Sequence, residues 1–246
     1  MIYLQQLSNS VETLPILTAV IDTALCVGVG GSSGSLADKP IVRNAEKNLL
    51  IPASQLKGRL RHECEKIARG LGWSICESPN PQTMCRQRAG VPGNFEREEY
   101  EFTDAITGEK NHHCLICQIF GNPALPSRAI FDDLIYTEDP DNLPTEVLRP
   151  GVTINRYRRT AEDQKLYFLE TSPANAQLRF EGKIHLQPKL KPDLPDYAKV
   201  LIWAGLKHIT ALGGSKSAGL GWLHWVEIHP LEVDLGVWDF LAKGRL

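Results

Sequence analysis

The stretch PDYAKVLIWAGLKHITALGGSKSAGLGWLHWVEIHPLEV, residues 195–233, holds three sequence patterns in succession. Its first part, 195–212, is predicted to be a helix, because apolar and small side chains recur at helical spacing and form one stripe. Its last part, 221–233, has the composition of a strand. The loop between them, TALGGSKSAGLGW (210–222), contains four glycines, two serines and one lysine. A loop of this kind allows something to approach the backbone closely.

Four further predicted elements precede this stretch, and together with it they give an order of strands and helices found in a known fold class. Strands are predicted within 14–31, 128–139 and 176–188, and a helix is predicted to begin at Ser54, as its N-cap, and to end at a glycine. The resulting order of strand, helix, strand, strand, helix, strand is that of ferredoxin-like folds, which RNA-recognition folds share. We therefore expect an α+β fold with a ferredoxin-like, RRM-like palm (β-α-β-β-α-β).

Two segments fall outside that order. Residues 72–128 show no clean period, contain several prolines and most of the cysteines, and are predicted to be an irregular insertion that needs a staple. Residues 151–173 are predicted to form an extended arm or hairpin with a basic tip. We expect one domain over 1–246, with 72–128 as a Cys-rich inserted subdomain and the arm over about 140–175.

The composition is that of a soluble globular protein, with 42% hydrophobic and 23% charged residues among 246. No apolar run is long enough to span a membrane, and MIYLQQLSNSVETLP at the N-terminus does not resemble a secretory signal, so we expect a cytoplasmic protein without a membrane partner. The net charge of −2 does not favour nucleic acid, but basic residues concentrate in 54–69 and 149–165. The simplest alternative is that these runs are solvated basic faces.

The glycine loop does not fit a nucleotide-binding motif. In a phosphate-binding P-loop, lysine directly follows the last glycine, whereas here Ser215 separates Gly214 from Lys216. The loop also follows a helix and precedes a strand, so no helix N-terminus faces it. One interpretation is a tight turn in which Gly213 caps the helix. We favour a bare backbone that binds a polyanion, with residues of this loop as donors: Gly213, Gly214, Ser215, Lys216 and Ser217.

The six cysteines are more consistent with metal ligands or buried thiols than with disulfides in a chain without an export signal. Cys114-x-x-Cys117 is half of a metal site. Cys76 and Cys85 are the preferred completing ligands, which predicts a structural zinc that staples the insertion. Two alternatives stay open: reduced thiols packed as small apolar groups, and replacement of one cysteine by another ligand, namely Cys64, His112 or His113.

Several motifs in family order resemble one superfamily. They are LADKPIVRN with LLIPASQLKGRLR (36–61), CLICQIFGNP (114–123), the glycine loop and, more loosely, TINRYRRTAEDQKLYFLE (153–170). Together they resemble the RAMP superfamily of CRISPR proteins, specifically Cas-seven-like, Csm/Cmr-type backbone subunits of type III effector complexes. The resemblance implies a ferredoxin-like palm whose copies stack along a CRISPR RNA guide beside other effector subunits, in many cases cutting the paired target RNA.

The resemblance also assigns roles to particular residues. Asp38 matches the aspartate used for cleavage, which implies a divalent metal (Mg or Mn) and attack by the 2′-hydroxyl of the RNA. Ser54 and Lys57 match contacts to the RNA backbone, and Arg61 shares their helical face at i, i+3, i+7 spacing. The alternatives are a turn aspartate at position 38 and a solvated basic helix face.

The arm matches the region where the family extends a thumb that displaces a base. Its arginines, Arg156, Arg158 and Arg159, are predicted to contact phosphates, and Tyr157 to stack on a base, although an exposed basic hairpin explains them equally well. The sequence departs from the family at Asn44, where relatives often have aspartate, and elsewhere at Ala218, where many have arginine.

These observations predict a subunit that binds CRISPR RNA and cleaves paired target RNA as an endoribonuclease. The first alternative is a structural subunit that binds the guide and cuts nothing. The second is a repeat-processing ribonuclease with histidine acid–base chemistry, for which His208 and His224 flank the glycine loop. Histidines in a helix and a strand are more often structural.

Overall fold

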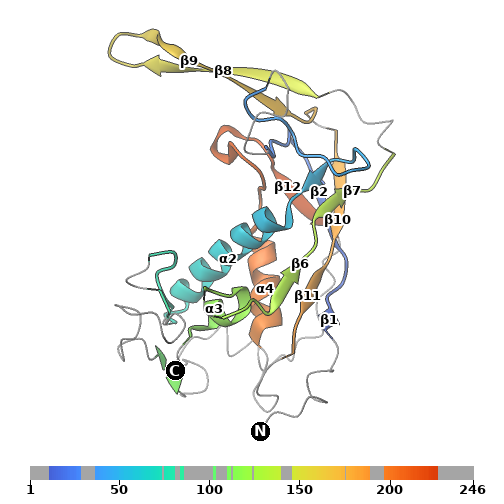
Figure 1. Ribbon diagram of the computed structural model, residues 1–246, viewed down its shortest axis with the longest axis vertical. Coiled ribbons are helices and arrows are strands. Elements are labelled where there is room, and N and C mark those ends of the chain that lie inside the picture. Colours follow the sequence, from blue (N-terminus) through green and yellow to red (C-terminus); the bar gives the residue numbers. More distant parts are fainter. Residues whose placement is uncertain are drawn as a thin grey trace.

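The computed structural model shows a mixed α/β chain built around an antiparallel five-stranded sheet of order β12-β2-β10-β7-β3 (Figure 1). The structure describes residues 11–28, 37–73, 75–80, 84–85, 102–103, 110–111, 113–123, 125–139, 146–174, 176–188 and 197–226. The sheet strands are β2 (Leu17–Ile21), β3 (Leu50–Ile51), β7 (Leu134–Tyr136), β10 (Leu178–Gly182) and β12 (Leu223–Val226).

Strand β2 lies between β12 and β10 in this sheet, and every one of its side chains is buried. It pairs with β10 on one side, where Ala19 lies opposite Phe180, and with β12 on the other, where Ile21 lies opposite Leu223. A strand that is buried on both faces reads as a continuous apolar run, which is how LTAVI appears in the sequence.

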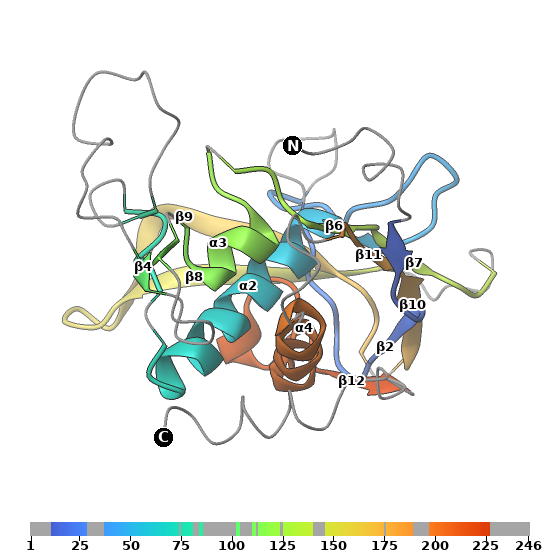
Figure 2. The same cartoon turned by 90° about the horizontal axis from the view of Figure 1, so that it is seen from below.

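Helices α2 (Ala53–Gly70) and α4 (Tyr197–His208) lie beside one another to one side of the strands (Figure 2). Their backbones approach closely at Gly205, where an added Cβ would lie 2.7 Å from the Cys64 sulfur. The predicted apolar stripe of α4 is confirmed, because its members and their continuation Ile209 and Leu212 are buried. The core therefore lies between these helices and the sheet.

Helix α2 begins at Ala53, with Pro52 as its N-cap residue, so the prediction that Ser54 caps the helix is wrong. Asp133 performs that task from the start of β7, since its Oδ1 accepts the Ala53 N–H at 2.6 Å. The cap therefore comes from a residue 80 positions away in the chain, which local sequence patterns do not reveal. Ser54 is left exposed in the first turn.

The remaining strands form smaller units. A three-stranded sheet has the order β1-β11-β6, and the two longest strands of the described residues pair as the β8–β9 hairpin at one end of the molecule (Figure 1). Short strands β4 and β5 form a separate pair. Their bounds are β1 (Glu12–Thr13), β4 (Phe102–Thr103), β5 (Lys110–Asn111), β6 (Ala129–Phe131), β8 (Val147–Asn155), β9 (Thr160–Thr171) and β11 (Ile184–Leu186).

The expected order of six elements is present, but two predicted strands are divided. The segment 128–139 forms β6 and β7, interrupted at Asp132 and Asp133, and 176–188 forms β10 and β11, interrupted at Lys183. Each half joins a different sheet. The predicted continuation of the last strand, 227–233, lies outside the described residues. Among the helices of the described part of the chain, none is long and apolar enough to cross a membrane.

Candidate functional site: a cysteine cluster and a loop junction

Four cysteines converge in the region predicted to need a staple. The Sγ atoms of Cys76, Cys85, Cys114 and Cys117 all lie within 4.8 Å of one another, and all four residues are buried. The structure therefore brings together the four residues that the sequence favoured as metal ligands. Such a set of four sulfurs is typical of closed structural zinc sites.

The sulfur distances fit a metal better than a disulfide. Cys76 Sγ lies 3.5 Å from Cys117 Sγ and 3.7 Å from Cys114 Sγ. A disulfide requires about 2.05 Å between sulfurs. A tetrahedral site with zinc–sulfur bonds of about 2.3 Å has sulfur–sulfur edges of about 3.8 Å. Residues and spacing therefore fit a tetrahedral divalent metal such as zinc.

Helix α3 (Leu115–Phe120) presents the CxxC half of the cluster. Cys114 is its N-cap residue and Cys117 lies one turn later, so both sulfurs point to the same side. The Cys114 N–H donates to Cys85 Sγ at 3.1 Å, and the Arg61 guanidinium approaches Cys117 Sγ from helix α2 at 3.7 Å. Hydrogen bonds to sulfur of this kind favour the thiolate, which is the form that binds metal.

The protonation of the four thiols is linked. Hydrogen bonds from Cys114 and Cys117 hold the pKa of the Cys76 thiol well below its usual value. The same interactions raise the pKa of Cys117, because its neighbours ionise first. The four thiols therefore do not ionise independently, as expected of sulfurs held this close together.

The other candidate ligands are engaged elsewhere. Cys64 is buried between α2 and α4, where its thiol donates to the Leu201 carbonyl at 3.4 Å and burial raises its pKa. His113 Nδ1 lies 2.9 Å from the Asn122 side-chain nitrogen. His112 lies outside the described residues. Among the described residues, the cluster is complete with four cysteines.

The second region is a junction of loops around residues 24–28, directly after β2. The glycine loop joins it through the Gly214 N–H, which donates to the Cys26 carbonyl at 2.6 Å, and through the Gly221 N–H, which donates to the Ala24 carbonyl at 2.9 Å. The end of β9 joins it where the Ser172 N–H donates to the Leu25 carbonyl at 2.9 Å. We call this region the loop junction.

A small apolar cluster lies beneath the loop junction. It consists of Ala24, Cys26 and Leu220, with Leu169 of β9 packed against it. It is separate from the main core. The glycine loop and the base of the hairpin therefore share both hydrogen bonds and a packed layer with the same five-residue segment.

The glycine loop has a fixed backbone. Gly221 has φ +70°, and an added Cβ would lie 1.7 Å from the Leu212 carbonyl oxygen. Gly213 has φ +95° and lies five residues beyond the last residue of α4, so the interpretation that it caps the helix is wrong. An added Cβ at Gly213 would lie 2.7 Å from the Cys26 carbonyl oxygen, so a side chain there would push the loop away from residues 24–28, and one at Gly221 would push it away from Leu212.

Three consecutive backbone N–H groups of the glycine loop have no acceptor in the part of the chain that the structure describes. Among the described residues, no protein group accepts the N–H of Ser215, Lys216 or Ser217, which begin the short 3-10 helix η3 (Lys216–Ala218). Ser215 has left-handed backbone angles, and successive N–H groups in such a turn form a concavity suited to an anion. Lys216 Nζ donates to the Gly213 carbonyl at 2.9 Å, which holds its charge over the same loop.

Asp38 joins the loop junction from the other side. Its Oδ2 accepts the Phe168 N–H at 2.7 Å, and its own N–H donates to the Phe168 carbonyl at 3.0 Å. The chain then runs parallel to β9, with Lys39 bridged to Leu169, and the Glu170 carboxylate accepts the Ile41 N–H at 2.8 Å. Asp38 is exposed. Its carboxylate is therefore held at the base of the hairpin and open to solvent.

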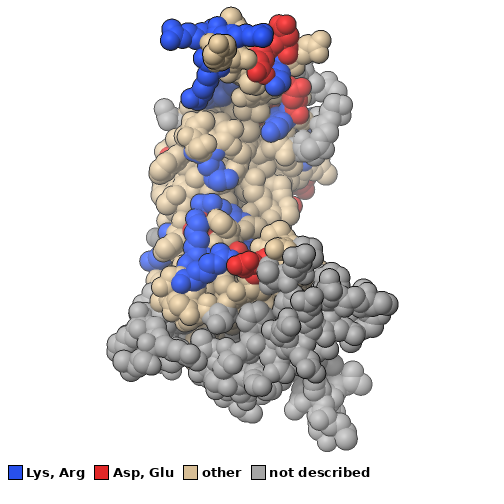
Figure 3. Space-filling view, turned by 90° about the vertical axis from the view of Figure 1, so that its left-hand side faces the viewer, with Lys and Arg blue, Asp and Glu red and all other residues tan. Residues whose placement is uncertain are grey.

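Basic residues gather on the face of the molecule that carries these features. Figure 3 shows one group of Lys and Arg at the hairpin end and another at the height of α2. At the hairpin tip, the Asn155 side chain accepts the N–H groups of Tyr157 and Arg158, and Tyr157 is 96% exposed. Arg156, Arg158 and Arg159 are exposed there as well.

Helix α2 contributes less charge to this face than the sequence suggested. Ser54 is exposed and Lys57 is half-buried, and burial together with the nearby Arg61 lowers the pKa of Lys57. Arg61 points to the cysteine cluster and to the Gly121 carbonyl. Its predicted contact to RNA stays a prediction, but its side chain has protein partners.

Comparison with known proteins assigns the chain to a family. Residues 18–224 match the RAMP superfamily. The chain belongs to this superfamily. It is also 25% identical over 224 residues to the "CRISPR system Cms endoribonuclease Csm3" of Methanocaldococcus jannaschii, a match that covers 87% of this chain and 79% of that protein.

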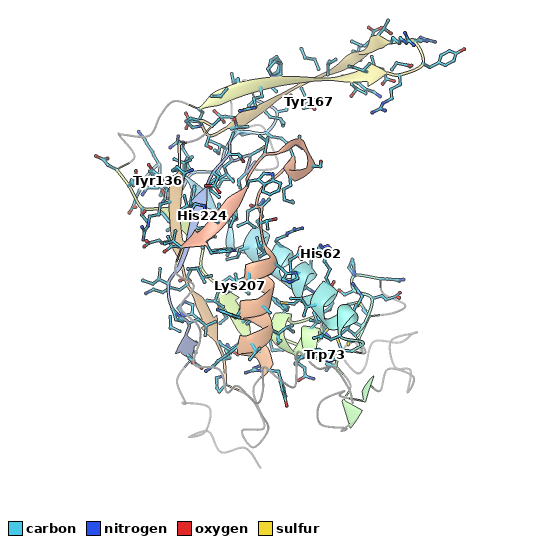
Figure 4. All side chains as sticks on the ribbon, turned by 180° about the vertical axis from the view of Figure 1, so that it is seen from behind. His62, Trp73, Tyr136, Tyr167, Lys207 and His224 are labelled. Carbon is cyan, nitrogen blue, oxygen red and sulfur yellow. The ribbon has the colours of Figure 1, made fainter. Side chains whose placement is uncertain are left out.

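Several residues that build this RAMP chain were not found from the sequence. Residues 24–28 carry no motif, and Glu170 and Asp133 act on segments more than 75 positions away. Both histidines near the glycine loop, His208 and His224, are exposed, and Figure 4 labels His224 on β12. His224 Nδ1 lies 3.0 Å from Asp22, which gives it a structural partner. No local pattern singles out Glu170, because β9 (TAEDQKLYFLET) does not alternate between polar and apolar residues.

Proposed function

We propose that this chain is a guide-RNA-binding backbone subunit of a type III CRISPR effector complex in the cytoplasm, and that it cuts paired target RNA with Asp38. Membership of the RAMP superfamily supports this, as does the similarity to a CRISPR endoribonuclease. The observation that carries the proposal is the loop junction: residues 24–28 hold the glycine loop, β9 holds the exposed Asp38 carboxylate through the Phe168 N–H, and the Ser172 N–H beyond β9 donates to Leu25.

The palm of this subunit is proposed to be ferredoxin-like. Omitting β3, the strand order is β12-β2-β10-β7, which places the first and third strands of the β-α-β-β-α-β order in the centre. The two helices α2 and α4 pack against each other beside the sheet, as that fold requires. The Cys-rich segment 72–128 is an insertion stapled by zinc, and the β8–β9 hairpin is the thumb.

The guide is proposed to lie with its phosphates against the glycine loop. The N–H groups of Ser215, Lys216 and Ser217, which have no acceptor among the described residues, offer three donors, and the Lys216 ammonium adds charge. Ser54 and Lys57 extend this surface from the first turns of α2, which lie below the glycine loop along the long axis (Figure 1). The arginines of the hairpin tip extend it at the other end.

Cleavage is proposed to use the 2′-hydroxyl of the target strand. Its oxygen attacks the adjacent phosphorus, the bond to the 5′-oxygen breaks, and that oxygen leaves with a proton to give a cyclic phosphate and a free 5′-hydroxyl. One oxygen of Asp38 is held by the Phe168 N–H, so the carboxylate has a fixed orientation toward solvent. The other oxygen is proposed to orient the 2′-hydroxyl or to hold a divalent metal.

Asp38 alone is a sparse metal site. Mg²⁺ prefers six oxygen ligands, so phosphate oxygens of the RNA and water would supply most of them. Such an ion would neutralise charge that develops on the scissile phosphate. The protein itself contributes one positioned carboxylate. The bonds to β9 fix the backbone of the segment that carries Asp38.

The test is target cleavage by the assembled complex, with magnesium or with chelator. Asp38→Ala should slow regular cleavage by about 100-fold or more without changing guide occupancy. Asp163→Ala, which removes an exposed carboxylate of the hairpin, is the matched control. Cleavage that persists at wild-type rate in Asp38→Ala would contradict the assignment.

Two other outcomes separate the alternatives. A wild-type complex that binds guide and target but does not cut identifies a structural subunit. Cutting of free repeat RNA by the isolated chain, lost on His224→Ala, identifies a processing ribonuclease.

A further inference from the structure

Arg61 makes three contacts, and none of them points away from the protein. Its Nε donates to Glu65 Oε1 at 3.0 Å, Nη1 donates to the Gly121 carbonyl at 2.9 Å, and Nη2 donates to Cys117 Sγ at 3.7 Å. The side chain is 21% exposed. Both distant partners belong to the segment that carries the CxxC half of the cysteine cluster.

The negative charge of a metal-loaded cluster would be partly compensated by these contacts of Arg61. Four thiolates around one divalent cation leave two negative charges uncompensated, and the cluster is buried. Burying charge is costly unless it is paired and hydrogen-bonded. The guanidinium supplies a positive charge and an N–H donor directly at one sulfur, and hydrogen bonds of this kind to metal ligands tune the affinity of a site.

The position of the second acceptor is fixed independently. Gly121 has φ +80°, and an added Cβ would lie 2.8 Å from the Ser127 nitrogen. Its N–H donates to the Cys117 carbonyl, so the Gly121 peptide is tied to the same turn as the metal ligand. The planar fork of arginine reaches the carbonyl and the sulfur at once, which a lysine ammonium on a single stem does not do.

We propose that Arg61 is a positioning residue of the cysteine cluster rather than an RNA contact. It stabilises the metal-loaded form through Cys117 and joins the cluster to helix α2. This inference rests on the metal site of the proposed function and is independent of the cleavage assigned to Asp38. It also places the metal site in direct contact with the helix that carries Ser54 and Lys57.

The test compares arginine variants in the full-length chain loaded with zinc. Arg61→Lys keeps the charge and loses the fork, and Arg61→Gln keeps a donor and loses the charge. Arg59→Lys is the matched control, since Arg59 lies on the same helix and pairs with Glu63 at 2.9 Å. The readouts are zinc content, the rate of zinc transfer to a chromogenic chelator, and the affinity for guide RNA.

We expect zinc to leave Arg61→Lys and Arg61→Gln about 10-fold faster or more, and to leave Arg59→Lys at the wild-type rate. Guide affinity of the zinc-loaded Arg61 variants should stay within about 2-fold of wild type, because the side chain does not reach the RNA. Unchanged zinc release with weakened guide binding would overturn the inference and assign Arg61 to the RNA. A wild-type chain that binds no zinc would overturn it as well, without touching the role of Asp38.

Discussion

The cysteine cluster and the loop junction are built in opposite ways. In the cluster, four buried side chains supply the chemistry, and the short helix α3 presents two of them. In the loop junction, most of the bonds that hold the glycine loop join backbone groups, the Asp38 and Glu170 carboxylates tie the neighbouring segment to β9, and Asp38 is exposed. The first site therefore depends on residue identity, and the second depends on how distant segments pair.

Removal of a cluster ligand should have the largest effect. Cys117→Ser removes one of four sulfurs, so metal affinity should fall by more than the roughly 10–100-fold typical of outer-shell changes. Metal analysis and thermal unfolding check this. Cys64→Ser is the control, because a hydroxyl there can still donate to the Leu201 carbonyl. If both variants bind the same amount of metal, Cys117 is not a metal ligand and does not differ in role from the buried thiol of Cys64.

The second largest effect is expected from a substitution that disturbs the backbone of the glycine loop. Gly221→Ala combines positive φ with a Cβ 1.7 Å from the Leu212 oxygen, so we expect a loss of about 4 kcal/mol in unfolding free energy. Gly219→Ala also has positive φ but nothing within 4 Å, and should cost about 1–2 kcal/mol. Denaturant unfolding measures both. If the two variants are equally stable, the close approach to Leu212 does not hold the loop.

Loosening the Asp38 segment should have a smaller effect. Glu170→Ala leaves the Ile41 N–H without its acceptor and should cost about 1 kcal/mol, with a several-fold slower cleavage by the assembled complex. Glu170→Gln keeps an oxygen acceptor and should restore most of the rate. Cleavage equally slow in both variants would mean that charge, and not the position of Asp38, is what Glu170 supplies.

The smallest effect on stability is expected at the hairpin tip. Tyr157 is 96% exposed, so Tyr157→Ala should change the unfolding free energy by no more than about 0.5 kcal/mol. The same variant in the complex should alter the pattern of target cuts if the ring stacks on a base. A stability loss above about 1 kcal/mol would show that the tip packs against the rest of the chain.

Side-chain patterns predicted much of the fold. The stripe of α4 follows from its helical periodicity, a strand was expected where β2 lies, and the CxxC spacing led to the four clustered cysteines. These features are local, or depend on residue types that have few other uses. The division of two predicted strands at Asp132 and Lys183 was missed, because pairing with a second sheet is a tertiary effect.

The loop junction was only partly predictable. The glycine loop and Asp38 were singled out by composition and by resemblance, but nothing local shows that both are attached to residues 24–28 and β9. The helix cap at Asp133 and the contacts of Arg61 were missed for the same reason. A donor that serves a distant carbonyl looks the same in sequence as one that faces solvent or RNA.

The central claim is that the loop junction faces RNA, and the structure of the assembled complex with guide and target tests it most directly. We predict guide phosphate oxygens within hydrogen-bonding distance of the Ser215, Lys216 and Ser217 N–H groups, and the target strand beside Asp38. A complex in which another protein subunit covers these three N–H groups, with the RNA on a different face, would contradict the account.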